Sequence, residues 1–84
     1  IDLKSDLALA QLTAGIVCQS LMKYPEAVGF FTQAIKLNAP NIELAYDGRS
    51  ISYDKTGMKE LATADANVAA LLNKLQDKPE DVPT

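Results

Sequence analysis

The stretch YDGRSISYDKTG, residues 46–57, is compatible with two different local structures. An Asp-Gly pair followed by alternating polar and apolar residues is typical of a β-hairpin. The same residues can instead form one helix that ends at Gly57, because many helices end at a glycine with a left-handed backbone. The choice between hairpin and helix decides the fold class.

An internal repeat favours the helix. A shift of 35 residues aligns residues 46–57 with QLTAGIVCQSLM, residues 11–22, which carries no hairpin signal and has a helical pattern. The second half of each copy also follows a helical spacing of i, i+4, i+7, at Ala27, Phe31 and Ala34 and again at Ala62, Ala66 and Ala69. We therefore expect Gly48 to lie inside a helix, where glycine costs about 1 kcal/mol relative to alanine.

The sequence predicts an all-α fold with four helices, over residues 5–22, 25–38, 42–56 and 58–76. Asp2 or Ser5 is the expected N-cap of the first helix and Asn41 that of the third, while Pro25 suits a first helical position. The connections are short, so consecutive helices are expected to be antiparallel, as two helix hairpins. The proline-rich, charged residues 77–84 are expected to form a flexible tail or linker.

The composition argues against several classes of function. The chain has 84 residues, enough for one small domain, and its formal charge of −3 is concentrated after residue 40, without a basic stripe that would favour nucleic acid. No apolar run approaches the ~20 residues of a membrane-spanning helix. The absence of a visible targeting segment leads us to expect a cytoplasmic protein.

Catalytic and metal chemistry have few candidate residues. With one cysteine, Cys18, and no histidine, the chain can build neither an internal disulfide nor the usual zinc sites and histidine-dependent nucleophiles. Asp47 and Asp54, two turns apart on one helix, form the best carboxylate pair, and we expect them to be solvated charges. We therefore expect no enzymatic activity, no metal and no cofactor. Arg49 is expected to pair with an acid of the next helix, such as Asp65, or to stack on an aromatic ring.

A helix pair that repeats at this length resembles the tetratricopeptide repeat, whose unit is 34 residues. The first copy carries the resemblance in AGIVCQSLMKYPEAVGFFTQAIKLNAP, residues 14–40, at Gly15, Tyr24, Ala27, Phe31, Ala34, Leu37 and Pro40. The second copy matches at Tyr46, Ser50, Tyr53, Gly57, Ala62 and Ala69. The chain departs from the family at Gln11 and Cys18 in the first copy and at Ala66 in the second, where large aromatic residues are usual. The resemblance implies repeats over about 8–41 and 43–76, stacked as an α-solenoid within a domain of residues 1–76; a generic antiparallel helical bundle is the alternative.

The resemblance further implies a concave groove, lined by the first helix of each hairpin, that binds partner proteins. Its positions in this chain are Leu9, Leu12, Thr13, Ile16, Gln19, Ser20, Leu44, Asp47, Gly48, Ile51, Asp54 and Lys55. A groove that is apolar at one end and polar at the other suits the apolar face of a helix or an extended peptide. The Lys and Asn residues with which some members clamp a C-terminal carboxylate are missing. The expected function is therefore a non-catalytic scaffold or adaptor; a purely structural or oligomerising domain is the alternative.

The first helix predicts an interaction without reference to the family. Apolar or small residues occupy nearly its whole circumference between residues 7 and 22, and a helix that is apolar all round is normally buried all round. Two hairpins leave it at an edge. We expect self-association, as a homodimer, through this helix; a missing repeat or a partner protein could also cover it, or Leu9 and Leu12 could simply be exposed.

Overall fold

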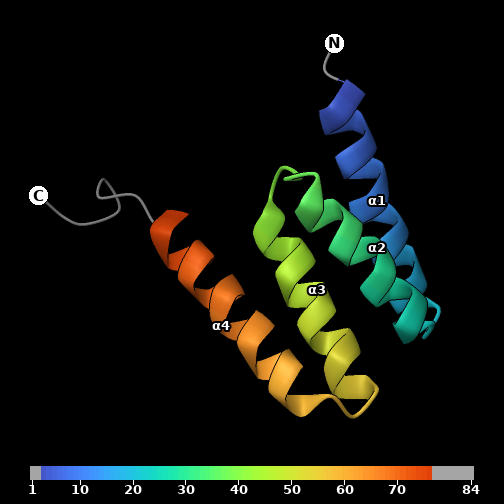
Figure 1. The fold of residues 1–84 in the computed structure, drawn as a ribbon, viewed down its shortest axis with the longest axis vertical. Coiled ribbons are helices and arrows are strands. Elements are labelled where there is room, and N and C mark those ends of the chain that lie inside the picture. Colours follow the sequence, from blue (N-terminus) through green and yellow to red (C-terminus); the bar gives the residue numbers. More distant parts are fainter. Residues whose placement is uncertain (1–2, 77–84) are drawn as a thin grey trace, which may run out of the picture.

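The structure is a computed structural model that describes residues 3–76, and these residues form four helices joined by short turns (Figure 1). Their bounds are Leu3–Ser20 for α1, Tyr24–Lys36 for α2, Ile42–Lys55 for α3 and Lys59–Gln76 for α4. No strand occurs in this part of the chain. The all-α prediction is confirmed, and the stretch 46–57 lies in α3 and its C-terminal turn rather than in a hairpin.

The helices lie side by side in the order of the chain. Each packs against the next, α1 on α2, α2 on α3 and α3 on α4, and α1 also contacts α3. Among the helices that the structure describes, α4 packs only against α3, so α1 and α4 lie at opposite edges (Figure 1). A closed four-helix bundle would bring its first and last helices together, and this open arrangement does not.

The core is centred on the ring of Phe31 in α2, which is fully buried. The ring lies between a glycine of α1 and a glycine of α3. A Cβ atom on Gly15 would lie 2.7 Å from Phe31 Cδ1, and a Cβ atom on Gly48 would overlap the same ring at Cζ. Glycine is therefore required inside α3 because the ring occupies the space of a side chain, and this close approach accounts for the Asp-Gly pair.

Three of the helices end in the same way, with a residue of left-handed backbone. It is Met22 after α1 (φ 63°), Asn38 after α2 (φ 58°) and Gly57 after α3 (φ 85°). After α3, the Met58 N–H donates to the Tyr53 carbonyl at 2.8 Å, which closes a Schellman motif, and the corresponding bonds follow α1 and α2. The helix end predicted at Gly57 is confirmed.

The predicted N-caps are corrected by the structure. Asn41 precedes α3 with a left-handed backbone (φ 56°), and its side chain makes no capping hydrogen bond. An N-cap side chain reaches the first-turn N–H groups from an extended backbone, so Asn41 cannot cap in this conformation. Ser5 lies inside α1, and Asp2 and the tail at 77–84 lie outside the described residues. Pro25 lies in the first turn of α2, as predicted.

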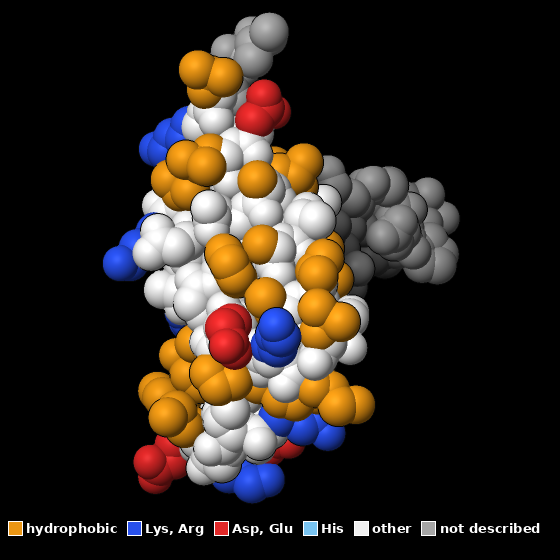
Figure 2. All heavy atoms as spheres, turned by 90° about the vertical axis from the view of Figure 1, so that its right-hand side faces the viewer, with side chains coloured by type: hydrophobic (Ala, Val, Ile, Leu, Met, Phe, Trp, Pro, Cys, Tyr) orange, Lys and Arg blue, Asp and Glu red, His pale blue; other side chains and the backbone are white. Residues whose placement is uncertain are grey.

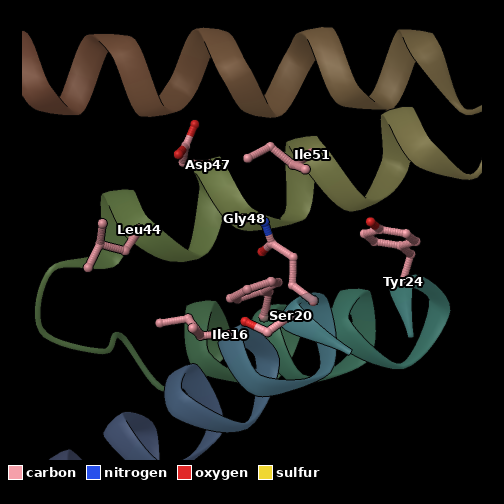
Figure 3. A pocket seen from close by; sticks show the side chains of 9 residues that line it. Ile16, Ser20, Tyr24, Leu44, Asp47, Gly48 and Ile51 are labelled. Carbon is pink, nitrogen blue, oxygen red and sulfur yellow. The ribbon is translucent and has the colours of Figure 1, made fainter. Parts of the chain in front are cut away.

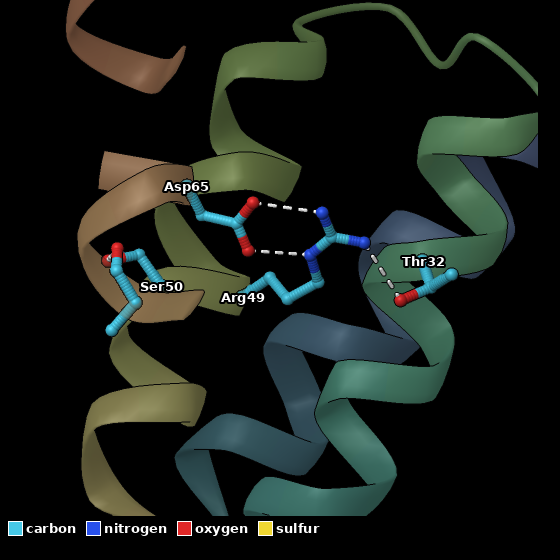
Figure 4. A network of polar contacts seen from close by, with 5 residues as sticks. Thr32, Arg49, Ser50 and Asp65 are labelled. Carbon is cyan, nitrogen blue, oxygen red and sulfur yellow. Dashed lines mark hydrogen bonds and ion pairs between the residues drawn. The ribbon is translucent and has the colours of Figure 1, made fainter. Parts of the chain in front are cut away.

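Polar contacts fix α4 against α3 (Figure 4). Arg49 donates from Nε and Nη2 to the two carboxylate oxygens of Asp65, at 2.7 and 2.9 Å, and from Nη1 to the hydroxyl of Thr32 at 3.1 Å. Its guanidinium lies 5.6 Å from the ring centroid of Tyr46 and 5.7 Å from that of Tyr53. The hydrogen bond to Asp65 raises the pKa of Arg49. Both the predicted ion pair and the predicted aromatic contact are confirmed.

Candidate partner-binding groove

A hollow of about 330 Å³ lies between α1 and α3 (Figure 3). It is lined by Ile16, Gln19, Ser20, Tyr24, Phe31, Leu44, Asp47, Gly48 and Ile51. Seven of the twelve residues predicted for the groove therefore lie together here: Ile16, Gln19, Ser20, Leu44, Asp47, Gly48 and Ile51.

Helical spacing explains why these side chains converge. On α3, Leu44, Gly48 and Ile51 follow the spacing i, i+4, i+7 and so share one face. On α1, Ile16 and Ser20 are one turn apart and face α3 (Figure 3). Gly48 adds no side chain, so the edge of the buried Phe31 ring forms part of the floor.

The walls of the hollow combine apolar side chains with a few polar ones. Ile16, Leu44 and Ile51 are large apolar residues with much of their surface exposed to solvent. Figure 3 shows Leu44 and Tyr24 at opposite ends, with Asp47 on the α3 side. An apolar surface with a few polar groups at its margin is the usual composition of a site that binds an organic ligand or a peptide.

The prediction that Leu12 lines the groove is wrong. Leu12 is only 3% exposed and belongs to the core with Ala8 and Phe31, so it is not available to a partner. Leu9 and Thr13 are exposed on α1 but do not line the hollow. The reason is the rotation of α1, whose Ala8–Leu12–Gly15 face is turned into the molecule.

The two charged residues predicted for the lower groove also lie outside the hollow. Lys55 and Asp54 are exposed, and Asp54 accepts a hydrogen bond from Lys59 of α4 at 2.9 Å. That bond lowers the pKa of Asp54. Asp54 lines a neighbouring hollow between α3 and α4, together with Ile51 and Ala66. Asp47 and Asp54 therefore line different hollows and do not form a carboxylate pair.

Tyr24 and Phe31 line the hollow although neither was predicted to. Tyr24 is the first residue of α2, a helix from which the resemblance implied no groove residues. It follows Ser20 across the α1–α2 turn, so the short connection was the signal that could have placed its ring next to the end of α1. Phe31 was not among the predicted groove residues, and its buried ring lies directly beneath the hollow because both facing residues are glycines.

The described residues contain no group of three or more Asp, Glu, Cys or His side chains that could hold a metal ion. Within the same residues, no helix has the length and apolarity needed to cross a membrane. Comparison with protein-family models, with curated proteins and with solved structures finds no match to this chain. The resemblance to the tetratricopeptide repeat therefore rests on the residues and spacings of this sequence.

Proposed function

We propose that this chain is a non-catalytic protein-interaction domain, which binds the apolar face of a helix or an extended apolar peptide in the groove between α1 and α3. The observation that carries this proposal is the exposure of Ile16, Leu44 and Ile51 around a hollow that lies directly over the buried ring of Phe31. Apolar side chains that converge on an open hollow are typical of sites that receive the anchor residue of a peptide.

The order of helix contacts supports a tetratricopeptide-like solenoid as the framework. In that family the first helices of successive hairpins lie next to each other along the concave side. The contact of α1 with α3, together with the absence of contact between α4 and either α1 or α2 in the described helices, fits this arrangement. We accordingly propose that the hollow is a segment of such a concave surface.

The charge of the groove indicates the chemistry of the partner. Asp47 is exposed at the margin, and no basic residue lines this hollow. A peptide with one large apolar anchor followed by a Lys or Arg would place its cation near Asp47. We therefore expect a basic, amphipathic segment to bind more tightly than an acidic one, and increasing salt to reduce that preference.

The test is to select peptides that bind the purified domain from a displayed library and to measure their affinity by fluorescence anisotropy. Ile16→Asp and Ile51→Asp place a charge in the apolar hollow, so we expect each to weaken binding at least about tenfold, a change of ~1.4 kcal/mol. Leu61→Asp alters a leucine of α4 that is exposed and does not line the hollow, and serves as the matched control. Circular dichroism confirms that each variant is folded. Unchanged affinity in both isoleucine variants would place the site elsewhere.

A second candidate function is homo-oligomerisation through α1, and a specific observation favours it. Leu3 and Leu7 of this edge helix, and Leu21 in the turn directly after it, are more than half exposed to solvent. Exposed leucines on an edge helix are typical of an interface. We propose that a second copy of the chain covers them.

A further inference from the structure

The outer face of α1 carries a regular apolar stripe that the groove does not use. It consists of Leu3, Leu7, Ala10, Ala14 and Val17 of α1, together with Leu21, which follows the last residue of the helix and whose N–H still bonds to the Val17 carbonyl; we call it the outer stripe. The steps between its members are 4, 3, 4, 3 and 4 residues, which is the a/d spacing of a coiled coil. At about 100° per residue, the outer stripe lies opposite Ala8 and Leu12, which face the core.

Most of this face is open to solvent in the monomer, although Ala14 is half-buried. Leu3 is 77% exposed and Leu7 is 51% exposed, and Val17 and Leu21 are exposed to a similar degree. Figure 2 views the side of the molecule where α1 and α2 lie and shows apolar side chains at many points of this surface, with charged side chains between them. No charged residue belongs to the outer stripe, so two such surfaces can meet without opposing like charges.

The outer stripe is also symmetrical about its own centre. Read from either end, the order of side-chain sizes is large, large, small, small, large, large. Reversal about position 12 exchanges Leu3 with Leu21, Leu7 with Val17 and Ala10 with Ala14. A two-fold interface between antiparallel helices requires this self-complementarity, because each position meets its mirror position on the other copy.

We propose that α1 pairs with α1 of a second copy in antiparallel orientation, with residue i opposite residue 24 − i. The inference rests on the proposed self-association and adds its orientation and register. The small central residues, Ala10 and Ala14, let the two helices approach closely, while the leucines close both ends. Antiparallel pairing also places each helix N-terminus next to a C-terminus, which aligns the two helix dipoles favourably.

The grooves remain open in this dimer. Ile16, which lines the groove, points about 140° away from the centre of the outer stripe on the helix circumference, so dimerisation leaves it accessible. The dimer would therefore present two grooves to a partner. A partner with two matching segments would bind more tightly than a partner with one. Once its first segment is bound, the second segment is held at a high effective concentration near the other groove.

The size of the outer stripe predicts a weak dimer. An 18-residue helix is about 27 Å long, and one helix pair of that length covers less than the ~800 Å² per partner of a standard interface. We expect the molecular mass from light scattering to rise from monomer to dimer over micromolar concentrations. A mass that stays at the monomer value at the highest concentration would refute self-association and the register with it.

Matched leucine variants test which face is used. Leu7→Asp buries a charge at the proposed interface, so we expect a monomer at concentrations where the native chain is dimeric. Leu71 lies on α4 and is 58% exposed, close to the exposure of Leu7, and Leu71→Asp should leave the dimer intact. Equal dissociation by Leu71→Asp would show that α4 is in the interface. That result would favour head-to-tail association of α1 on α4 and overturn the proposal.

Engineered cysteines test orientation, in a chain that carries Cys18→Ser so that no native thiol interferes. A disulfide requires Cα atoms within about 7 Å, whereas the two copies of Leu3 in the antiparallel register are about 27 Å apart. Oxidation should therefore link a Leu3→Cys chain to a Leu21→Cys chain in a mixture, and should leave Leu3→Cys alone unlinked. Cross-linking of Leu3→Cys with itself would show a parallel dimer, which would overturn the register while leaving self-association and groove binding intact.

Discussion

Both hairpins consist of two helices joined by a Schellman turn, but they are held together by different chemistry. In the first, the ring of Phe31 fills the space between α1 and α3, and the surrounding contacts are apolar. In the second, the equivalent position is Ala66, which is exposed, and α4 has no aromatic residue. Two polar contacts connect α3 to α4 instead (Figure 4). Arg49 pairs with Asp65, and the Ser50 hydroxyl donates to the Ala62 carbonyl at 2.7 Å.

This difference indicates which contacts stabilise the molecule and which fix the relative position of its helices. Burial of apolar surface is roughly proportional to area and not directional, so the first hairpin supplies most of the stabilisation. A bidentate Arg–carboxylate pair is directional and fixes geometry more than it adds free energy. The second hairpin therefore depends on a few specific contacts, and α4 is the helix that should separate first when they are removed.

The largest effect is expected from Phe31→Ala. Removing the ring leaves a cavity between Gly15 and Gly48 that no neighbouring side chain can fill, and such truncations cost about 3–5 kcal/mol. That is a large fraction of the stability of a domain of this size. Urea unfolding followed by circular dichroism should show the transition of the whole domain at a lower urea concentration.

Phe30→Ala is the matched control for Phe31→Ala. Phe30 is the neighbouring residue, is half-buried and lines a shallow surface hollow with Gly29. Its truncation leaves no enclosed cavity, so we expect a much smaller loss of unfolding free energy. Equal losses in the two variants would contradict a core centred on Phe31.

A smaller, local effect is expected from Asp65→Ala. The Arg49 and Asp65 side chains are 17% and 8% exposed, so the variant leaves a partly buried guanidinium without its carboxylate. Loss of a fully buried partner costs about 3–5 kcal/mol, and the partial exposure of Arg49 leads us to expect about 2 kcal/mol. Hydrogen exchange should show loss of protection confined to α4.

Two further variants sharpen this prediction. Asp54→Ala removes the exposed pair with Lys59 and should leave the unfolding free energy unchanged within error, because both side chains are well solvated.

The double change Arg49→Met with Asp65→Leu removes both charges and should recover much of the stability lost in Asp65→Ala. If the double variant were as unstable as Asp65→Ala, a buried unpaired charge would not be the cause.

The sequence was sufficient to predict the helices and their pairing because these depend on local periodicity and on the internal repeat. The partner of Arg49 was also predictable. Because α3 and α4 are antiparallel and joined by a short turn, Asp65 of α4 lies beside Arg49 of α3. The faces of α1 were harder to assign. Apolar or small residues occupy nearly the whole circumference of this helix. The pattern therefore could not distinguish the core residue Leu12 from the groove residue Ile16, one turn away.

The remaining errors have different physical causes. An asparagine before a helix is a good sequence signal for an N-cap, but the capping bond requires an extended backbone, and Asn41 adopts a left-handed one. Tyr24 entered the groove because a tight turn places the start of α2 beside the end of α1. Both outcomes depend on the path of the connections, which side-chain periodicity does not encode.

Among the variants expected to change stability, the smallest effects are expected at the two equivalent hairpin turns, where the residue types differ and the backbones agree. Met22 and Gly57 occupy the same position in Schellman motifs, with φ of 63° and 85°. A left-handed backbone costs a residue with a Cβ atom about 1–2 kcal/mol, and part of the gain in Met22→Gly is offset by the entropy of the unfolded chain. We expect Met22→Gly to raise the unfolding free energy by about 0.5–1 kcal/mol and Gly57→Ala to lower it by about 1 kcal/mol. No atom lies within 4 Å of a Cβ built on Gly57, so the cost there would be conformational alone. Shifts of the same sign in both variants, measured by urea unfolding, would show that side-chain contacts of Met22 outweigh its backbone strain, and that the two turns are equivalent in shape but not in energy.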